Sequence, residues 1–206
     1  LRAGDVLVLN DSKVIPARLE FKWGQVRRTP DSSGGKAEIL LLEPLSSFTW
    51  ECLVQPGEKF VVGAHQFIDS ELSFKVKEVR SGVRVIEFEC QNFKEYLKTH
   101  GHVPTPPYIK EPVRNPDEYQ TIYAKPEGSV AAPTAGFHFT DRVFEGLKAK
   151  GIQMEFLTLH VGLGTFAPVK TEDITEHRIH SEWFELPKDV ADRLNQAKRA
   201  GKKIVA

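Results

Sequence analysis

The stretch L-R-A-G-D-V-L-V-L-N (1–10) decides the fold because it contains the unbroken apolar run V-L-V-L (6–9). Apolar residues without polar alternation are typical of a strand that is covered on both faces. Such a strand needs neighbours in a sheet, and the suitable partners occur only after residue 100. We therefore expect an α+β fold, with a mixed-sheet α/β main domain that is interrupted by an insertion.

The second half of the chain supplies the partners and the covering helices. It predicts strands at 152–161 and 178–186, a helix between Thr140 and Gly151, and a helix between Pro187 and Gly201. Phe93, Tyr96 and Leu97 stand at helical spacing, and Gly101 is expected to end that helix in a left-handed conformation. The proline-rich stretch 102–110 is interpreted as an extended arm outside any sheet.

The insertion has an all-β pattern from about residue 19 to 92. Its candidate strands are 38–43, 49–54, 59–62, 72–78 and 83–90, separated by Gly, Pro and Ser clusters. The apolar parity switches between Val85 and Ile86, which indicates a bulge or a barrel corner. The predicted organisation is a main domain at 1–18 and 96–206 with a small inserted β-barrel at 19–95.

Composition points to an ordinary protein of the cytoplasm. Lys+Arg and Asp+Glu both number 28, so any RNA site must be a local patch rather than a global charge excess. Cys52 and Cys90 have no disulfide or zinc-finger spacing and are predicted to be buried. No apolar run approaches the ~20 residues that span a bilayer. The chain starts without Met and stops as a strand begins, so we expect an excised fragment.

Two motifs carry candidate site residues. S-V-A-A-P-T-A-G-F-H-F (129–139) is poor in bulky side chains, which lets backbone N–H groups approach a ligand, and it offers Thr134 and His138. T-L-H-V-G-L-G-T-F (158–166) leaves a strand at His160 and enters a glycine-punctuated turn. The alternatives are a tight loop packed under a helix and a core histidine.

Three further segments supply polar and aromatic groups. In H-R-I-H-S-E (177–182), the two histidines point to opposite faces of a strand, which disfavours a shared metal site. N-D-S-K-V-I-P-A-R (10–18) offers basic side chains for a phosphate or carboxylate, or forms a plain polar turn. Tyr108 and Y-Q-T-I-Y (119–123) are suited to nucleobase stacking or to core packing.

The order of these segments resembles the S-adenosylmethionine:tRNA ribosyltransferase-isomerase family of queuosine biosynthesis. The resemblance rests on N-D-S-K-V-I-P-A-R-L, P-T-P-P-Y-I, Y-Q-T-I-Y-A, S-V-A-A-P-T-A-G-F-H-F-T, T-L-H-V-G-L-G-T-F-A-P-V and H-S-E, and it covers residues 1–206. Phe137 departs from the leucine expected there. Family members start earlier and continue further, so part of the active site is expected to lie outside this chain, and the fragment alone is expected to be inactive.

The resemblance implies that S-adenosylmethionine donates a ribosyl group to 7-aminomethyl-7-deazaguanine at the tRNA wobble position. The products would be epoxyqueuosine, adenine and methionine. His160 and His180 are the expected acid and base, with His138 third. The expected S-adenosylmethionine contacts are Ala132, Pro133, Thr134, Gly136, Phe139, Gly162, Gly164, Thr165 and Phe166, and the expected tRNA contacts are Asn10, Lys13, Arg18, Tyr108, Tyr119 and Tyr123.

No metal and no membrane are expected, and the expected assembly is a monomer or a weak homodimer. Two other function classes stay open. A noncatalytic RNA-binding β-barrel module would bind tRNA without consuming S-adenosylmethionine. A metal-dependent hydrolase, suggested by the seven histidines, would lose its activity to chelators.

Overall fold

The computed structural model of the chain has two compact units. It describes residues 1–24, 34–80, 82–105, 109, 113, 115–162, 173, 175 and 181–206. The α/β unit comprises Leu1–Val14 and Arg114–Ala206, and the β-rich unit comprises Ile15–Val113. The β-rich unit therefore also includes the segment 96–113, which the sequence patterns had placed with the main domain.

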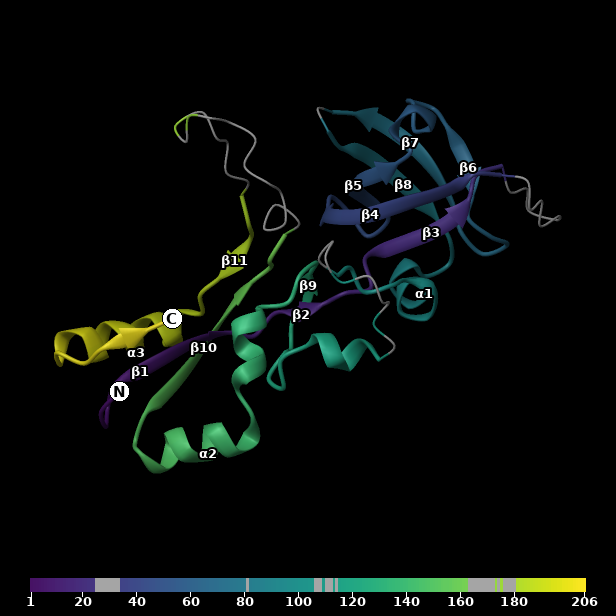
Figure 1. The fold of residues 1–206 in the computed structure, drawn as a ribbon. Coiled ribbons are helices and arrows are strands. Elements are labelled where there is room, and N and C mark those ends of the chain that lie inside the picture. Colours follow the sequence, from purple (N-terminus) through teal and green to yellow (C-terminus); the bar gives the residue numbers. More distant parts are fainter. Residues whose placement is uncertain are drawn as a thin grey trace. The chain divides into compact units, whose positions relative to one another are not determined.

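The α/β unit is built on a mixed four-stranded sheet with the order β11-β10-β1-β12 (Figure 1). Strand β1 (Val6–Asn10) lies in the middle and runs parallel to β10 (Gln153–Leu159) and β12 (Ile204–Val205). Strand β11 (Phe184–Glu185) is antiparallel to β10. The predicted α+β class with a mixed sheet is thereby confirmed.

Strand β1 is covered on both faces, as its apolar run predicts. Val6 and Val8 pack against Ala197 of α3 (Lys188–Arg199). Leu7 and Leu9 belong to a second cluster with residues of α2 (Asp141–Ala149), and Figure 1 shows the two helices beside the sheet. Because successive side chains of a strand point to opposite faces, one five-residue strand organises two hydrophobic layers.

The helix ends follow the signals in the sequence. The Thr140 hydroxyl accepts the N–H of Val143 at 3.4 Å and so caps α2. Gly151 and Gly201 follow α2 and α3 with φ of +70° and +68°, values that a residue with a Cβ rarely adopts. Pro187 precedes the first turn of α3. The predicted start and end of both helices are confirmed.

A buried carboxylate joins α3 to the sheet. Glu155 on β10 is 8% exposed and accepts two hydrogen bonds from Arg193, at 2.6 and 2.7 Å. We expect Arg193→Leu to lower the melting temperature clearly, because the carboxylate would lose its cation while staying buried. Lys188→Leu removes an exposed pair with Asp192 and should shift the melting temperature by about 1 °C or less. Equal melting temperatures for the two variants would contradict a stabilising role of the Arg193 pair.

A short parallel pair extends the α/β unit beyond β1. Strand β2 (Lys13–Val14) pairs with β9 (Glu127–Ser129). The Gln120 side chain, just after the 3-10 helix η2 (Pro116–Tyr119), bonds both the N–H and the C=O of Val14 at 2.9 Å. The polar turn after β1 is thus held by segments more than 100 residues away in sequence.

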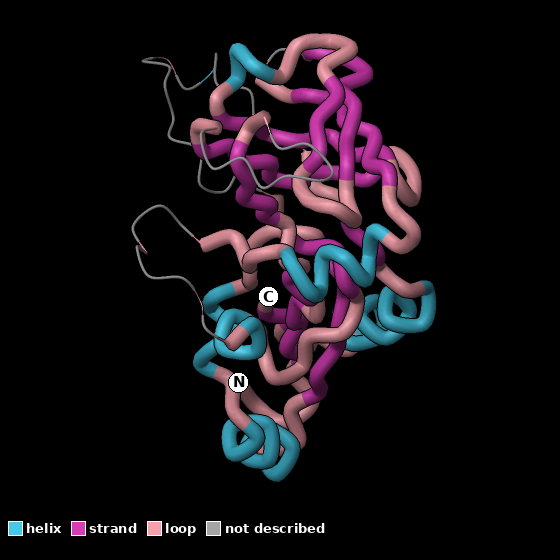
Figure 2. The backbone as a smooth tube through the Cα atoms, turned by 90° about the vertical axis from the view of Figure 1, so that its right-hand side faces the viewer, coloured by secondary structure: helices cyan, strands magenta, loops and turns pink. Residues whose placement is uncertain are grey.

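The β-rich unit contains a six-stranded antiparallel sheet with the order β3-β4-β5-β8-β7-β6, drawn among the magenta strands of Figure 2. Its interior contains aromatic rings, and Phe60 and Phe74 stack at 5.6 Å. Among the described strands, the edge strands β3 and β6 are not paired with each other, so a closed barrel stays a prediction. The strands are Arg18–Lys22, Lys36–Pro44, Thr49–Gln55, His65–Phe67, Ser73–Val79 and Arg84–Glu89 for β3 to β8.

Two details of the predicted β pattern need correction. Residues 59–62 do not form a strand, because a 3-10 turn at Gly57–Lys59 and the positive φ of Gly63 redirect the chain; β6 follows instead. The bulge indicated near Val85 and Ile86 exists, but the extra residue is Lys77 in the neighbouring strand β7. The parity switch in β8 therefore reflects a bulge on its partner.

The helix α1 (Phe93–His100) forms as predicted, but its end differs. Gly101 has φ of −75°, so it is not left-handed. A Cβ there would lie 2.2 Å from the Pro16 carbonyl oxygen, so glycine allows a close backbone approach. His102 then exchanges two backbone hydrogen bonds with Arg18, at 2.8 and 3.0 Å, so the proline-rich stretch begins as a strand partner rather than as a free arm.

Two expectations from composition can be compared with the structure. Cys52 is buried as predicted, whereas Cys90 is partly exposed because it lies just beyond the end of β8. Among the described residues, no helix is long and apolar enough to cross a membrane.

Candidate active site

The two motifs of the α/β unit meet at the backbone of Val161. Its carbonyl oxygen accepts the N–H groups of Val130 and Ala131 at 3.0 and 3.1 Å. Its own N–H donates to the hydroxyl of Ser129 at 2.9 Å, and Ser129 is fully buried. The two motifs are therefore bonded to each other through Ser129, Val130, Ala131 and Val161, just beyond the end of β10.

The last residue of β1, Asn10, holds the end of β10 in place by hydrogen bonds. The Asn10 side chain donates to the carbonyl of Leu159 at 2.9 Å and accepts its N–H at 3.0 Å. It also accepts the N–H of Ser12 at 3.0 Å. Both ends of the amide thus form hydrogen bonds within the protein, while contact of Asn10 with tRNA stays a prediction.

His160 is the first residue after β10, and its ring is held in a narrow place. Its N–H donates to the carbonyl of Trp183 at 2.9 Å, and the imidazole stacks on the Trp183 indole at 4.9 Å and 19°. A Cβ on Gly128 would lie 2.7 Å from both Cε1 and Nε2 of the ring. The imidazole therefore packs directly against a glycine backbone that no other residue could replace without movement.

The electrostatics of His160 favour a neutral ring. Burial lowers the pKa of His160, and the carboxylate of Asp11 opposes this without cancelling it. The Nδ1 atom is buried and finds no hydrogen-bond partner among the residues that the structure describes. A neutral imidazole with a free nitrogen can accept a proton or bind a ligand.

The second half of the first motif forms a turn in which a glycine allows close packing. Residues Thr134–His138 form the 3-10 helix η3, in which Gly136 is buried. A Cβ on Gly136 would lie 2.3 Å from the Tyr123 hydroxyl oxygen and 2.6 Å from Thr121. Thr134 and His138 are exposed on this turn.

Several expected contact residues also pack against neighbouring aromatic rings. Phe139 packs on Phe144 at 5.8 Å, and Tyr123 packs on the same ring at 5.5 Å. Burial raises the pKa of Tyr123, with the Thr121 hydroxyl acting in the opposite direction. Tyr119 is 6% exposed and meets Phe137 at 5.7 Å. Tyr119 is thus buried, Tyr123 and Phe139 are partly buried, and contact of the two tyrosines with tRNA bases stays a prediction.

Comparison with known proteins assigns the chain to a protein family. The model of the family described as "Queuosine biosynthesis protein" matches residues 1–206. The chain belongs to this family. A protein of Desulforamulus reducens named S-adenosylmethionine:tRNA ribosyltransferase-isomerase is 45% identical over 209 residues, and one of Clostridium kluyveri with the same name is 46% identical. Each alignment covers 100% of this chain and 59% of the relative, so the chain spans less than two thirds of these proteins.

A solved structure is also similar to this member of the queuosine family. The crystal structure of S-adenosylmethionine tRNA ribosyltransferase from Thermotoga maritima is 29% identical, and the match covers 99% of this chain and 51% of that chain, with a TM-score of 0.35.

The structure brings only some of the predicted site residues of this family member together. His160 and Gly162 lie with the segment 129–132 at the joined motifs, and the N–H of Gly162 donates to Glu182 at 2.8 Å. Lys13 belongs to the α/β unit and Arg18 to the β-rich unit, where Arg18 pairs with Glu38 at 3.5 Å. The predicted residues outside the described part of the chain are Tyr108, Gly164, Thr165, Phe166 and His180.

Three residues of this site were missed in the sequence. Gly128 directly precedes the first motif, and Trp183 directly follows H-S-E, so both lie one residue outside the motifs. Asp11 was read only as part of a polar turn. The hydroxyl of Thr158 donates to Asp11 at 2.8 Å, which holds this carboxylate at the exit of β10.

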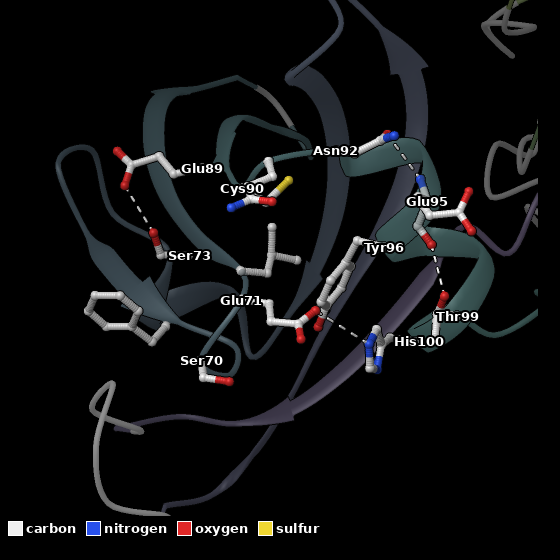
Figure 3. Close-up of a pocket in the computed structure, with 13 residues that line it drawn as sticks. Ser70, Glu71, Ser73, Glu89, Cys90, Asn92, Glu95, Tyr96, Thr99 and His100 are labelled. Atoms are coloured by element: carbon white, nitrogen blue, oxygen red, sulfur yellow. Dashed lines mark hydrogen bonds and ion pairs between the residues drawn. The ribbon is translucent and has the colours of Figure 1, made fainter.

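The β-rich unit has a separate cavity of about 830 Å³ (Figure 3). Tyr96 lies on its wall, donates to Asp69 at 2.5 Å and stacks on His100 at 4.5 Å. Burial, followed by the bond to Asp69, raises the pKa of Tyr96. The carboxylates of Glu71, Glu89 and Glu95 also line this cavity and disfavour a polyanion such as tRNA. Within the described ranges, no three His, Cys, Asp or Glu residues gather as a metal site in either unit.

We expect Gly136→Ala to disrupt the turn of the first motif in this family member. The new methyl group would collide with the Tyr123 hydroxyl, so either η3 or the Tyr123 ring must move. Turnover by the full-length protein should fall about tenfold or more, since misplacement by 1 Å can cost 100-fold. Gly146→Ala is the control, because nothing lies within 4 Å of its Cβ. Normal turnover in the Gly136→Ala protein would show that the position of η3 does not matter for the site.

Proposed function

We propose that this chain is part of an enzyme that transfers and isomerises the ribosyl group of S-adenosylmethionine onto tRNA. The acceptor would be 7-aminomethyl-7-deazaguanine at the wobble position, and the products epoxyqueuosine, adenine and methionine. The observation that carries this proposal is the bonding of the two motifs around a neutral His160. The names of the relatives, S-adenosylmethionine:tRNA ribosyltransferase-isomerase, support it.

His160 is the proposed general base. A sulfonium group acidifies the hydrogens on the neighbouring C5′ carbon, so a neutral imidazole in a water-poor site can remove one of them. The lowered pKa of His160 suits this task, because a general base must be unprotonated. Asp11 and Trp183 would hold the ring, and Gly128 would leave room for it.

The other roles follow from position along the chain. Adenine leaves more easily when a second group donates a proton to it, and His180 is the proposed donor, with the exposed His138 as the third candidate. The backbone of Ala132 and Pro133, the hydroxyl of Thr134 and the glycine-containing segment 162–166 are the proposed contacts to S-adenosylmethionine. Lys13 and Arg18 remain the proposed contacts to the tRNA backbone.

The decisive experiment uses the full-length protein, tRNA carrying the aminomethyl precursor, and S-adenosylmethionine. We expect the mass of the modified nucleoside to increase by the epoxy-cyclopentane unit, with release of free adenine and methionine. Binding of tRNA without consumption of S-adenosylmethionine would instead favour the noncatalytic RNA-binding module. Loss of a hydrolytic activity to chelators, without nucleoside modification, would favour the metal-dependent hydrolase.

A further inference from the structure

Trp183 is a large aromatic residue held beside His160 while half of it faces solvent. It is 53% exposed, although its indole stacks on the imidazole at 4.9 Å and 19°. Its carbonyl accepts the N–H of His160, and the following residue, Phe184, pairs with Leu159 of β10. The backbone of Trp183 is thus fixed next to the joined motifs, and the indole offers aromatic surface that the described residues leave uncovered.

We propose that Trp183 stacks on the adenine ring of S-adenosylmethionine. This inference rests on the proposed function and assigns to that site a residue that binds the base. A planar purine covers an exposed indole well, and each stacked base strengthens binding by about tenfold or more. With the adenine on Trp183, the ribose and sulfonium would extend toward the His160 ring that the same indole contacts.

Among the described residues, the charges near Trp183 favour this occupant over a base of tRNA. Glu182 and Glu185 flank it in sequence, and the Glu182 carboxylate is fixed by the N–H of Gly162 at 2.8 Å. The carboxylate of Asp11 acts on the neighbouring His160. Negative groups repel a phosphate backbone but attract a cationic sulfonium nucleoside. The same surroundings therefore select a positively charged substrate with an aromatic base.

The chain also provides a matched control. Phe184 is 64% exposed and adjoins Trp183 at the start of β11. Successive side chains of an extended segment point to opposite sides, so Phe184 does not share the face on which Trp183 meets His160. Removing Phe184 takes away a similar exposed ring without touching the proposed stack.

The test is the dissociation constant of S-adenosylmethionine, measured by equilibrium dialysis with the full-length protein. We expect Trp183→Ala to raise it about tenfold or more, Trp183→Phe to stay within about threefold, and Phe184→Ala to match the unchanged protein. Adenosine should compete for the unchanged protein and for Trp183→Phe, but compete much less for Trp183→Ala. Circular dichroism verifies folding, and Trp183→Leu replaces the alanine variant if that one does not fold.

Several results would overturn the inference. Unchanged binding of S-adenosylmethionine by Trp183→Ala would do so, and so would a loss of tRNA affinity alone, which would assign the indole to a tRNA base. A lower kcat at an unchanged dissociation constant would mean that Trp183 only positions His160. Failure of the proposed function is separate, because it would appear as absent nucleoside modification by the unchanged protein, whatever the binding data show.

Discussion

The full-length protein with His160→Gln is expected to turn over about 10²–10⁴ times more slowly than the unchanged protein. Glutamine keeps a polar side chain of similar reach but cannot take up a proton. The affinity for S-adenosylmethionine should stay within about threefold, because the proposed base acts on the reacting carbon rather than on the adenine. The measurement is the rate of adenine release in a single turnover.

The matched control is His65→Gln. His65 is a half-exposed histidine of β6 in the other unit, where it lies 3.6 Å from Glu89. It should release adenine at the unchanged rate. Adenine release at the full rate by His160→Gln would remove His160 as the base and move that role to His180 or His138.

The pH dependence provides an independent check on the same residue. Burial places the pKa of His160 below its ordinary value of 6.5. A base must be unprotonated, so kcat/KM should rise with pH through that lowered pKa and then level off. In His160→Gln this acid limb should disappear. An acid limb centred well above 6.5 would mean that a different group is titrating.

The central strand and the helix ends of the α/β unit were predictable because the signals for them are local in the sequence, whereas the strand predicted at 178–186 is a strand only at Phe184–Glu185 in the described residues. The apolar run at 6–9 reports burial on both faces directly, and Thr140 and Gly151 mark helix ends by their own chemistry. Gly101 shows the limit of this reasoning. It also follows a helix, yet it is glycine because the Pro16 carbonyl passes close by, and that carbonyl lies 85 residues earlier in the chain.

The site was predictable in outline but not in its contacts. Small residues and glycines marked both motifs, since ligands and backbones approach closely only where side chains are short. That Val161 bonds to Ser129, or that Trp183 stacks on His160, depends on pairings made by the whole sheet. For Tyr119 and Tyr123 the residue type alone does not separate the two interpretations, because nucleobase stacking and core packing use the same aromatic side chains.

Gly128→Ala is expected to cost both stability and turnover. Gly128 has φ of +152°, a region that is almost restricted to glycine, and this strain alone should cost about 1–3 kcal/mol. In addition, the new methyl group would lie 2.7 Å from two atoms of the His160 ring. The ring must therefore move away from its place on Trp183, and turnover should fall to nearly the level of His160→Gln.

Gly201→Ala is the control that introduces backbone strain in the same unit without a steric clash. Gly201 also has a positive φ, +68°, but nothing lies within 4 Å of its Cβ. Its substitution should lower the free energy of unfolding by about 1–2 kcal/mol and leave turnover unchanged. A loss of turnover by Gly201→Ala would mean that backbone strain anywhere in the unit disturbs the site.

A double-mutant cycle then tests whether Gly128 acts through His160. With His160→Ala the ring is absent, so Gly128→Ala should cost only the strain, and the cycle should give an interaction energy of about 0.5–3 kcal/mol. Urea unfolding of the four proteins supplies the values. An equal cost of Gly128→Ala in both backgrounds would mean that the two residues are independent. A coupled result would mean that Gly128 affects the site through His160. The reason would be that the imidazole occupies the space that a side chain at position 128 would need.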